Sequence, residues 1–159
     1  SAAKAAMDAA VAAGAEKYAT ADFNAAKTLW VATEAQMTEK KYEEAKKGYV
    51  STKAAFEKAA AAAAIGKKAM TDEVNAAMVA LEEGWKNLEV TAKSIEKKMK
   101  EKKDELAADT KSFMEGVKAT KDMIANDPAG AKAKAGELKA LIDKWDAAFK
   151  EMDTAPAKK

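Results

Sequence analysis

The stretch from Lys41 to Ile65, KYEEAKKGYVSTKAAFEKAAAAAAI, combines evenly spaced aromatic residues with a run of alanines. Tyr42, Tyr49 and Phe56 recur every seven residues, which places all three on one face of a helix. The alanines that follow form a surface that a neighbouring backbone can approach closely. The stretch therefore predicts the inner helix of a bundle, on which other helices pack.

The composition favours helices along the whole chain. Ala, Lys, Glu and Met are strong helix formers and dominate the 159 residues, whereas β-branched and aromatic residues are sparse. We predict an all-α fold, an elongated antiparallel bundle of about five or six helices with no sheet, as a single domain over residues 1–153. Within it, residues 1–65 form an alanine-rich hairpin region and residues 71–153 a long helix plus a C-terminal hairpin. Residues 154–159 are expected to be a flexible tail.

Two helices are expected ahead of the opening stretch. The first covers residues 2–18 and carries a narrow stripe formed by Met7, Val11, Gly14 and Tyr18. The second begins near Thr20, with either Thr20 or Asp22 as its cap. Its expected core face comprises Phe23, Ala26, Trp30, Thr33 and Met37. A short turn over residues 38–41 should make it antiparallel to the third helix, which is expected to end at Gly66.

The most regular pattern of the chain follows a new helix start at Thr71. Large side chains then recur three and four residues apart at Met78, Leu81, Trp85, Leu88, Ala92, Ile95 and Met99. Beyond Met99 the stripe resumes in another phase at Leu106, Phe113, Val117 and Ile124. A break or a kink near Asp109 is expected, and the pattern leaves open whether residues 71–126 form one bent helix or two.

The last boundary is marked by Asn126, Asp127 and Pro128, a capping side chain directly before a proline. The final helix should cover roughly residues 128–153. Its core side is expected to comprise Leu138, Leu141, Ile142, Trp145, Phe149 and Met152.

Several classes of function are disfavoured by what the sequence lacks. Histidine and cysteine are absent, which removes the imidazole acid or base, thiolate chemistry and the usual zinc ligands. All 28 basic residues are lysine, against 26 acidic ones, and specific nucleic-acid recognition relies heavily on arginine. We therefore expect no enzyme, no catalytic residue, no cofactor, no metal site and no specific nucleic-acid partner.

Large aromatic residues are the remaining candidates for a binding site. Those that we expect to act as core anchors, or to line a groove for a partner, are Trp30, Tyr42, Tyr49, Trp85 and Trp145. Paired carboxylates such as Asp104 and Glu105 sit among lysines and indicate a solvated helix surface. The lysines between Lys93 and Lys103 are interrupted by acidic residues, which favours the same interpretation over contact with an anionic surface.

Two resemblances concern the first part of the chain. KKYEEAKKGY, residues 40–49, resembles the second helix of a tetratricopeptide repeat, but no second copy recurs at the period of about 34 residues that such arrays need. AEKYA at residues 15–19, Phe23 before two alanines, and KKYEEAKK with its alanine run are similar to an uncharacterised alanine-rich helical domain of bacterial envelope lipoproteins. This resemblance covers roughly residues 2–65 and implies a periplasmic or secreted address with a structural or binding role.

The expected function is a nonenzymatic structural or protein-interaction module of the bacterial cell envelope. It would bind a protein partner, or associate with itself, through helix faces. The alternative is a lysine-rich stress-type protein, or one that associates with anionic membranes or nucleic acid. No apolar run approaches the roughly 18 to 20 residues of a transmembrane helix, so no such segment is expected. Whether a signal or lipid-anchor segment preceded Ser1 is left open.

Overall fold

The computed structural model of the protein describes residues 1–155. Within them the chain is all-α and contains no strand, as the composition predicts, with seven helices where five or six were expected. The helices are α1 (Ala2–Ala12), α2 (Ala15–Tyr18), α3 (Thr20–Thr38), α4 (Tyr42–Ser94), α5 (Glu96–Met99), α6 (Lys102–Met123) and α7 (Pro128–Thr154). The expected tail at residues 154–159 lies largely outside the described part, since Thr154 ends α7 and residues 156–159 are not described.

The chain divides into two compact units, one comprising Ser1–Ala69 and the other beginning at Met70. Each unit has its own cluster of buried apolar residues, centred on Phe23 and Phe56 in the first and on Trp85 and Trp145 in the second. Two cores thus stand where one domain over residues 1–153 was expected. Helix α4 belongs to both units, with residues 42–69 in the first and 70–94 in the second.

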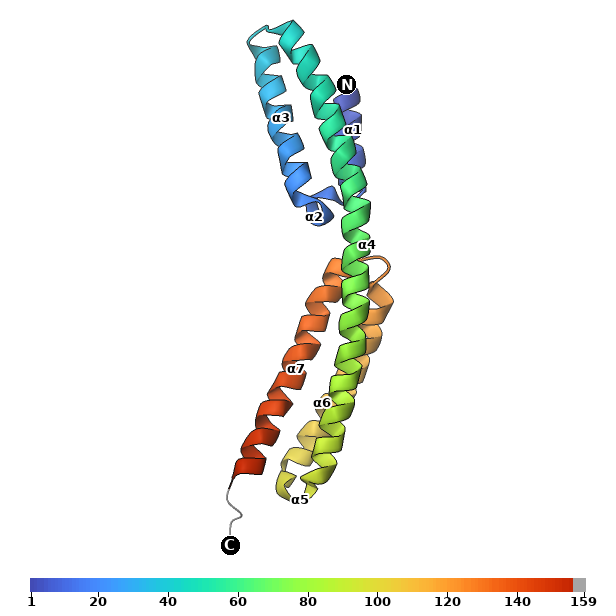
Figure 1. Cartoon of the computed structure of the whole chain (residues 1–159), viewed down its shortest axis with the longest axis vertical. Coiled ribbons are helices and arrows are strands. Elements are labelled where there is room, and N and C mark those ends of the chain that lie inside the picture. The colour runs from blue at the N-terminus through green and yellow to red at the C-terminus, as the bar shows by residue number, and fades with distance from the viewer. Residues whose placement is uncertain (156–159) are drawn as a thin grey trace. The chain divides into compact units, whose positions relative to one another are not determined.

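In the first unit, α1 and α3 lie beside the N-terminal half of α4 (Figure 1). Cross-helix pairs show that α3 and α4 are antiparallel, because residues near the start of α3 contact higher-numbered residues of α4 than residues further along α3 do. These pairs are Asp22 with Lys58, Phe23 with Phe56, Trp30 with Tyr49, and Thr33 with Thr52. The short link after Thr38 produces the expected hairpin, and Lys40 turns the chain with a φ of 61°.

The predicted first helix is wrong in two respects. It ends at Ala12, because Gly14 adopts a φ of 78° that glycine takes at little cost, and α2 starts anew at Ala15. Its buried face runs through Ala3, Ala6 and Ala10, while Val11 of the expected stripe is 47% exposed. The small side chains on this face permit close approach to the neighbouring helices. Close packing therefore favours burial of the alanine face over the face that carries Val11.

Helix α3 starts at Thr20 as expected, but neither Thr20 nor Asp22 is its N-cap residue. The N-cap position is Ala19, which makes no side-chain cap, and the Thr20 hydroxyl instead donates to the Glu16 carbonyl at 2.8 Å. Asp22 forms an ion pair with Lys58 across the hairpin at 2.7 Å. The prediction that Met37 belongs to the core face of α3 is wrong, because this side chain is 40% exposed near the end of the helix.

The aromatic face of α4 is only partly buried. Phe56 is fully buried, Tyr49 is half-buried and Tyr42 is 60% exposed. The buried face is centred on Ala45, Thr52 and Ala59, so Tyr49 lies at its edge and Tyr42 outside it. The alanine end of the stretch behaves as predicted, because Ala59 and Ala63 are fully buried.

The expected end at Gly66 and the new start at Thr71 are both wrong, because α4 continues through them. Glycine inside a helix costs about 1 kcal/mol relative to alanine, which is not enough by itself to end one. Here the Tyr18 carbonyl oxygen lies so close to Gly66 that a side chain would collide with it. The glycine therefore serves close packing of α2 on α4 rather than a helix end.

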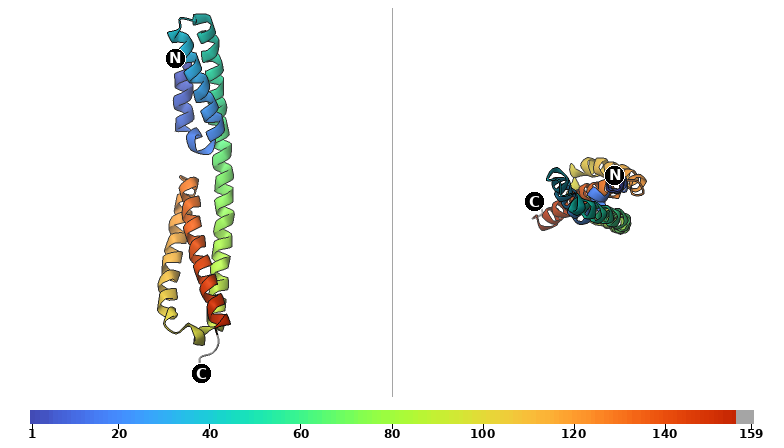
Figure 2. Two further views of the ribbon diagram at one scale, coloured as in Figure 1. Left: turned by 90° about the vertical axis from the view of Figure 1, so that its left-hand side faces the viewer. Right: turned by 90° about the horizontal axis from the view of Figure 1, so that it is seen from above.

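In the second unit, α6 and α7 pack against the C-terminal half of α4, and Figure 2 shows the same neighbours from another side. The heptad pattern is confirmed, because all seven of its residues from Met78 to Met99 are buried. The later stripe is also confirmed at Phe113, Val117 and Ile124, with Leu106 half-buried. Both patterns belong to one core.

Residues 71–126 form more than one helix, but the break is not near Asp109, which lies inside α6. The chain leaves α4 after Ser94, makes the single turn α5, and reverses at Lys100, whose φ of 41° is strained for a residue with a side chain. Neither glycine nor proline marks this turn. The only signal in the sequence is that the apolar heptad stops at Met99.

The final boundary is confirmed. Asp127 caps α7 by accepting from the Gly130 N–H at 3.1 Å, and Pro128 occupies the first helical turn. Leu138, Trp145 and Phe149 are buried on the predicted side of this helix.

Candidate functional site

Two of the three aromatic anchors of the first unit, Trp30 and Tyr49, form a small cluster at the surface. Trp30 is half-buried and meets Tyr49 edge to face, with ring centroids 5.9 Å apart. The Tyr49 hydroxyl donates to the Glu34 carboxylate at 2.5 Å, and this hydrogen bond raises the pKa of Tyr49. Tyr42 lies apart from the pair on the exposed side of α4.

Trp85 is a core anchor of the second unit. Its indole stacks on Phe113 with ring centroids 4.3 Å apart and an interplanar angle of 14°, and the residue is 1% exposed. No partner for the indole N–H is found among residues 1–155. The stacking joins α4 to α6.

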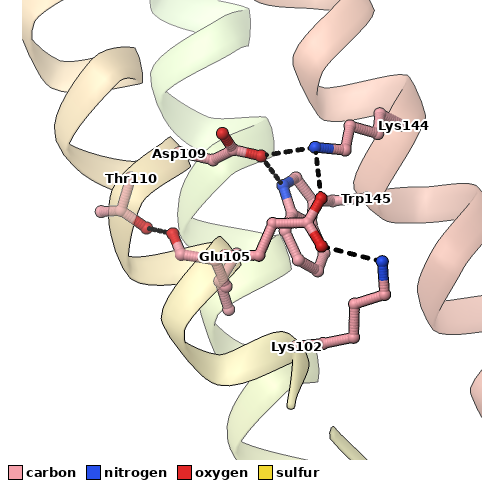
Figure 3. Close-up of polar contacts among 7 residues, drawn as sticks. Lys102, Glu105, Asp109, Thr110, Lys144 and Trp145 are labelled. Atoms are coloured by element: carbon pink, nitrogen blue, oxygen red, sulfur yellow. Dashed lines mark hydrogen bonds and ion pairs between the residues drawn. The ribbon is translucent and has the colours of Figure 1, made fainter.

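Trp145 is buried too, but its indole N–H is satisfied by a polar network (Figure 3). The N–H donates to the Asp109 carboxylate at 2.9 Å, and Lys144 pairs with the same oxygen at 2.8 Å. Lys144 also pairs with Glu105 at 2.7 Å, and Lys102 reaches Glu105 at 2.8 Å. The network ties α6 to α7 at the edge of the core.

The charges of this network shift its pKa values in the direction of ion pairing. Hydrogen bonds from Lys102 and Lys144 lower the pKa of Glu105 to about 2. Bonds to Asp109 and Glu105 raise the pKa of Lys144. Glu105 and Lys144 are thus held in their charged forms, which suits a structural network and not a group that exchanges protons near neutral pH.

An apolar groove of about 370 Å³ lies between α4 and α7 in the second unit. Its walls are mostly small, with Ala77, Ala80 and Gly84 on α4 and Gly136 and Ile142 on α7. Gly84 lies against Ile142, since a Cβ on this glycine would stand 3.2 Å from Ile142 Cδ1. At Gly136 a Cβ would meet nothing within 4 Å, so this wall is open.

Ion pairs flank the groove and leave it without net charge. Lys132 pairs with Glu73 across the two helices at 2.7 Å, and Lys139 pairs with Asp143 along α7 at 2.7 Å. All four residues line the groove. A neutral apolar floor with paired charges at the rim suits another protein surface better than a charged ligand.

None of the five aromatic anchors named from the sequence lines this groove. The sequence predicts large aromatic residues at a binding groove, whereas most of the wall residues are alanine and glycine, which leave space because they are small. A signal was present in the spacing of Ala77, Ala80 and Gly84, three and four residues apart beside the heptad. It indicates a second, small-residue face on α4.

The lysine-rich segment between Lys93 and Lys103 is largely neutralised by acidic neighbours. Lys98 pairs with Asp153 at 3.1 Å, and Lys103 pairs with Glu96 at 2.8 Å. Lys93, Lys97 and Lys100 are exposed and make no ion pair within the described part of the chain. Three lysines interspersed with acidic residues do not form a basic patch.

Among the described residues, no three side chains of Asp, Glu, His or Cys gather where they would hold a metal ion. None of the helices in residues 1–155 has the length and apolar character needed to cross a bilayer.

Comparison of the chain with protein-family models, with curated proteins and with solved structures gives no match. The groove between α4 and α7 is therefore the candidate site on the strength of its own residues.

Proposed function

We propose that this chain is a nonenzymatic structural or protein-interaction module that binds through helix-face packing. The groove between α4 and α7 is the observation that carries the proposal, because it is apolar and open while its rim charges are already paired. Alanine and glycine walls allow a helix backbone to approach closely, which is how helices without large side chains gain contact area. A protein surface with a small-residue helix is the expected partner.

The proposal is tested by blocking the groove without disturbing the fold. Gly136→Arg places a long side chain where the wall is open, whereas Ala133→Arg places the same side chain on an exposed position of α7 outside the groove. In gently lysed cells that make the protein, the unaltered chain and Ala133→Arg should migrate as a complex larger than the chain. Gly136→Arg should migrate as the free chain, and identical migration of all three would refute the proposed role of the groove.

We further propose that the protein acts in a bacterial cell envelope, at a periplasmic or secreted address. The support is the resemblance of residues 2–65 to the alanine-rich helical domain of envelope lipoproteins, a segment that lies within the first compact unit. The test is cell fractionation with marker proteins for each compartment. Release with the periplasmic or membrane-anchored markers is expected, and recovery with the cytosolic marker would contradict the address.

The alternative role, association with an anionic membrane or nucleic acid, has less support. It depends on the lysines between Lys93 and Lys103, and three of them face the carboxylates of Asp153, Glu96 and Glu105. Balanced charge also argues for a weak field, since 28 basic residues stand against 26 acidic ones.

A further inference from the structure

We propose that the occupant of the groove between α4 and α7 is the same face of a second copy of this chain, related by a two-fold axis with the helices antiparallel. This inference rests on the proposed function, because it names the partner of that same groove. Its basis is the charge pattern along α7, the open wall at Gly136 and the direction of the two helices that form the face.

The face is built from two parallel helices. Glu73 on α4 pairs with Lys132 on α7, and eleven residues further along α4, Gly84 lies against Ile142. Both partner numbers rise together, so α4 and α7 run in the same direction. No residue of α6 lines the groove, so α6 does not cover this side of the pair. Two such faces packed together give a four-helix arrangement.

A two-fold axis in the plane of the face, perpendicular to the helices, places α7 against α7 of the second copy in the opposite direction. With the axis level with Glu137 and Leu138, Lys132 stands opposite Asp143 of the second copy. Asp143 stands opposite the second copy's Lys132 by the same symmetry. The pattern is thus self-complementary, since each copy offers a cation where the other offers a carboxylate.

The same register also leaves room for Lys139, the long side chain in the middle of the face. Lys139 stands opposite Gly136 of the second copy, where a Cβ would meet nothing within 4 Å and the stem of a lysine has room to lie. On α4 the residues near the axis are Ala77 and Ala80, which permit close approach of the two backbones. Charge and size therefore select the same alignment.

A partner with a strong net charge fits this face less well. Each carboxylate of the rim already faces a lysine at 2.7 Å, and the floor between them is apolar. A polyanion would displace the carboxylates, and a highly acidic or basic helix would leave one sign unpaired at the rim. A second copy brings equal numbers of both signs.

The test is sedimentation equilibrium of the purified chain, with charge-reversed variants that separate intermolecular from intramolecular effects. Alone, Lys132→Asp and Asp143→Lys each place like charges opposite each other twice, and each should weaken dimerisation by about tenfold or more. Mixed in equal amounts, they should form a heterodimer, because both carboxylates of the Lys132→Asp chain then face lysines of the Asp143→Lys chain. A folding defect in either variant cannot produce this recovery.

Matched controls come from the same unit. Lys118→Asp with Asp122→Lys reverses an exposed ion pair on α6, which does not line the groove, and should leave the dimer unchanged. Gly136→Arg should be monomeric while keeping the helical circular-dichroism signal of the unaltered chain, because it removes a glycine from a helix and meets open space.

The inference is overturned if the unaltered chain stays monomeric up to about 1 mM, or if the mixture of the two charge variants does not associate. If the purified chain is monomeric but Gly136→Arg still abolishes the larger complex in cells, the second copy is wrong as occupant and the proposed function stands. If Gly136→Arg changes neither, both fail together.

Discussion

The indole N–H of Trp145 donates to the carboxylate of Asp109 at 2.9 Å, and this bond joins α7 to α6 at the edge of the second core. Trp145 is 1% exposed, so its N–H has little access to water. Asp109 lies where the stripe of apolar residues changes phase, and the sequence predicts a helix break or kink near this residue. Inside α6, the polar side chain of Asp109 accepts the hydrogen bond that the buried indole N–H of Trp145 needs.

Removing the carboxylate should therefore destabilise the second unit. Asp109→Ala leaves a buried N–H unpaired and removes one partner of Lys144, and we expect a loss of about 1–3 kcal/mol in the free energy of unfolding. Asp109→Asn keeps an acceptor and should lose less. Urea unfolding followed by tryptophan fluorescence measures the difference, with Asp104→Ala on the exposed side of α6 as control. Equal stability of Asp109→Ala and the unaltered chain would refute the role of this bond.

The lowered pKa of Glu105 makes a pH prediction. Because its pKa is about 2 in the folded chain and near 4.5 when unperturbed, the ionised form is favoured by folding. Its contribution to stability is present above pH 4.5 and is lost as pH falls from about 4.5 toward 2. Glu105→Gln should flatten the decline of the melting temperature over this window. Glu137→Gln, whose carboxylate makes no ion pair within residues 1–155, should follow the unaltered chain; a Glu105→Gln curve that also does so contradicts the assignment.

Gly66 and Gly136 should respond in opposite ways to the same substitution. Gly66→Ala introduces a methyl group that collides with the Tyr18 carbonyl, so α2 must move away from α4 and stability should fall. Gly136→Ala meets no atom and should stabilise its helix by about 0.5–1 kcal/mol. Thermal unfolding by circular dichroism distinguishes the two signs. A gain in stability for both variants would mean that α2 does not pack on Gly66.

The alanine run of α4 gives a packing prediction in the first unit. Ala59 and Ala63 are fully buried, so leucine at either position overpacks the core and should cost about 1–3 kcal/mol. Ala61 is exposed, and Ala61→Leu serves as the matched control with little expected change. Melting temperatures of the three variants provide the comparison. Unchanged stability in Ala59→Leu and Ala63→Leu would show that this face is not in the core.

The paired lysines near α5 predict weak attraction to anionic surfaces. Vesicles containing phosphatidylserine, mixed with the chain at low salt and then sedimented, should leave it in the supernatant, because carboxylates face three of the cations. The double variant Glu96→Gln with Glu105→Gln removes the carboxylates that face Lys103 and Lys102, and it should bind these vesicles more strongly. Salt-sensitive binding of the unaltered chain would favour the alternative function instead.

Fold class and much of the second unit could be predicted from the sequence, because they depend on local signals. Helix propensity, the heptad from Met78 to Met99 and the Asp127–Pro128 cap each act within a few residues. The errors arose where a distant contact decides the outcome. Gly66 resembles a helix end until Tyr18 is placed beside it, and Tyr42 resembles a core residue until the buried face of α4 is located.

The candidate site was harder to predict than the fold. Trp85 and Trp145, which the sequence offers as candidate anchors, are core residues, whereas alanines and glycines line the groove. A groove consists of the space that small side chains leave between two helices. The spacing of Ala77, Ala80 and Gly84 indicates a small-residue face on α4, but the space itself depends on how α4 packs against α7, which is far away in sequence.

Photocrosslinking from within the groove tests whether this face is the binding surface. Replacing Lys139, which lines the groove, by a diazirine-bearing lysine analogue keeps the length and position of the side chain, and the same analogue at the exposed Lys134 of α7 serves as control. In cells that make the protein, irradiation should give a protein adduct from position 139 and none above background from position 134. Equal labelling from both positions, or no adduct from either, would contradict the claim that this face is the binding surface.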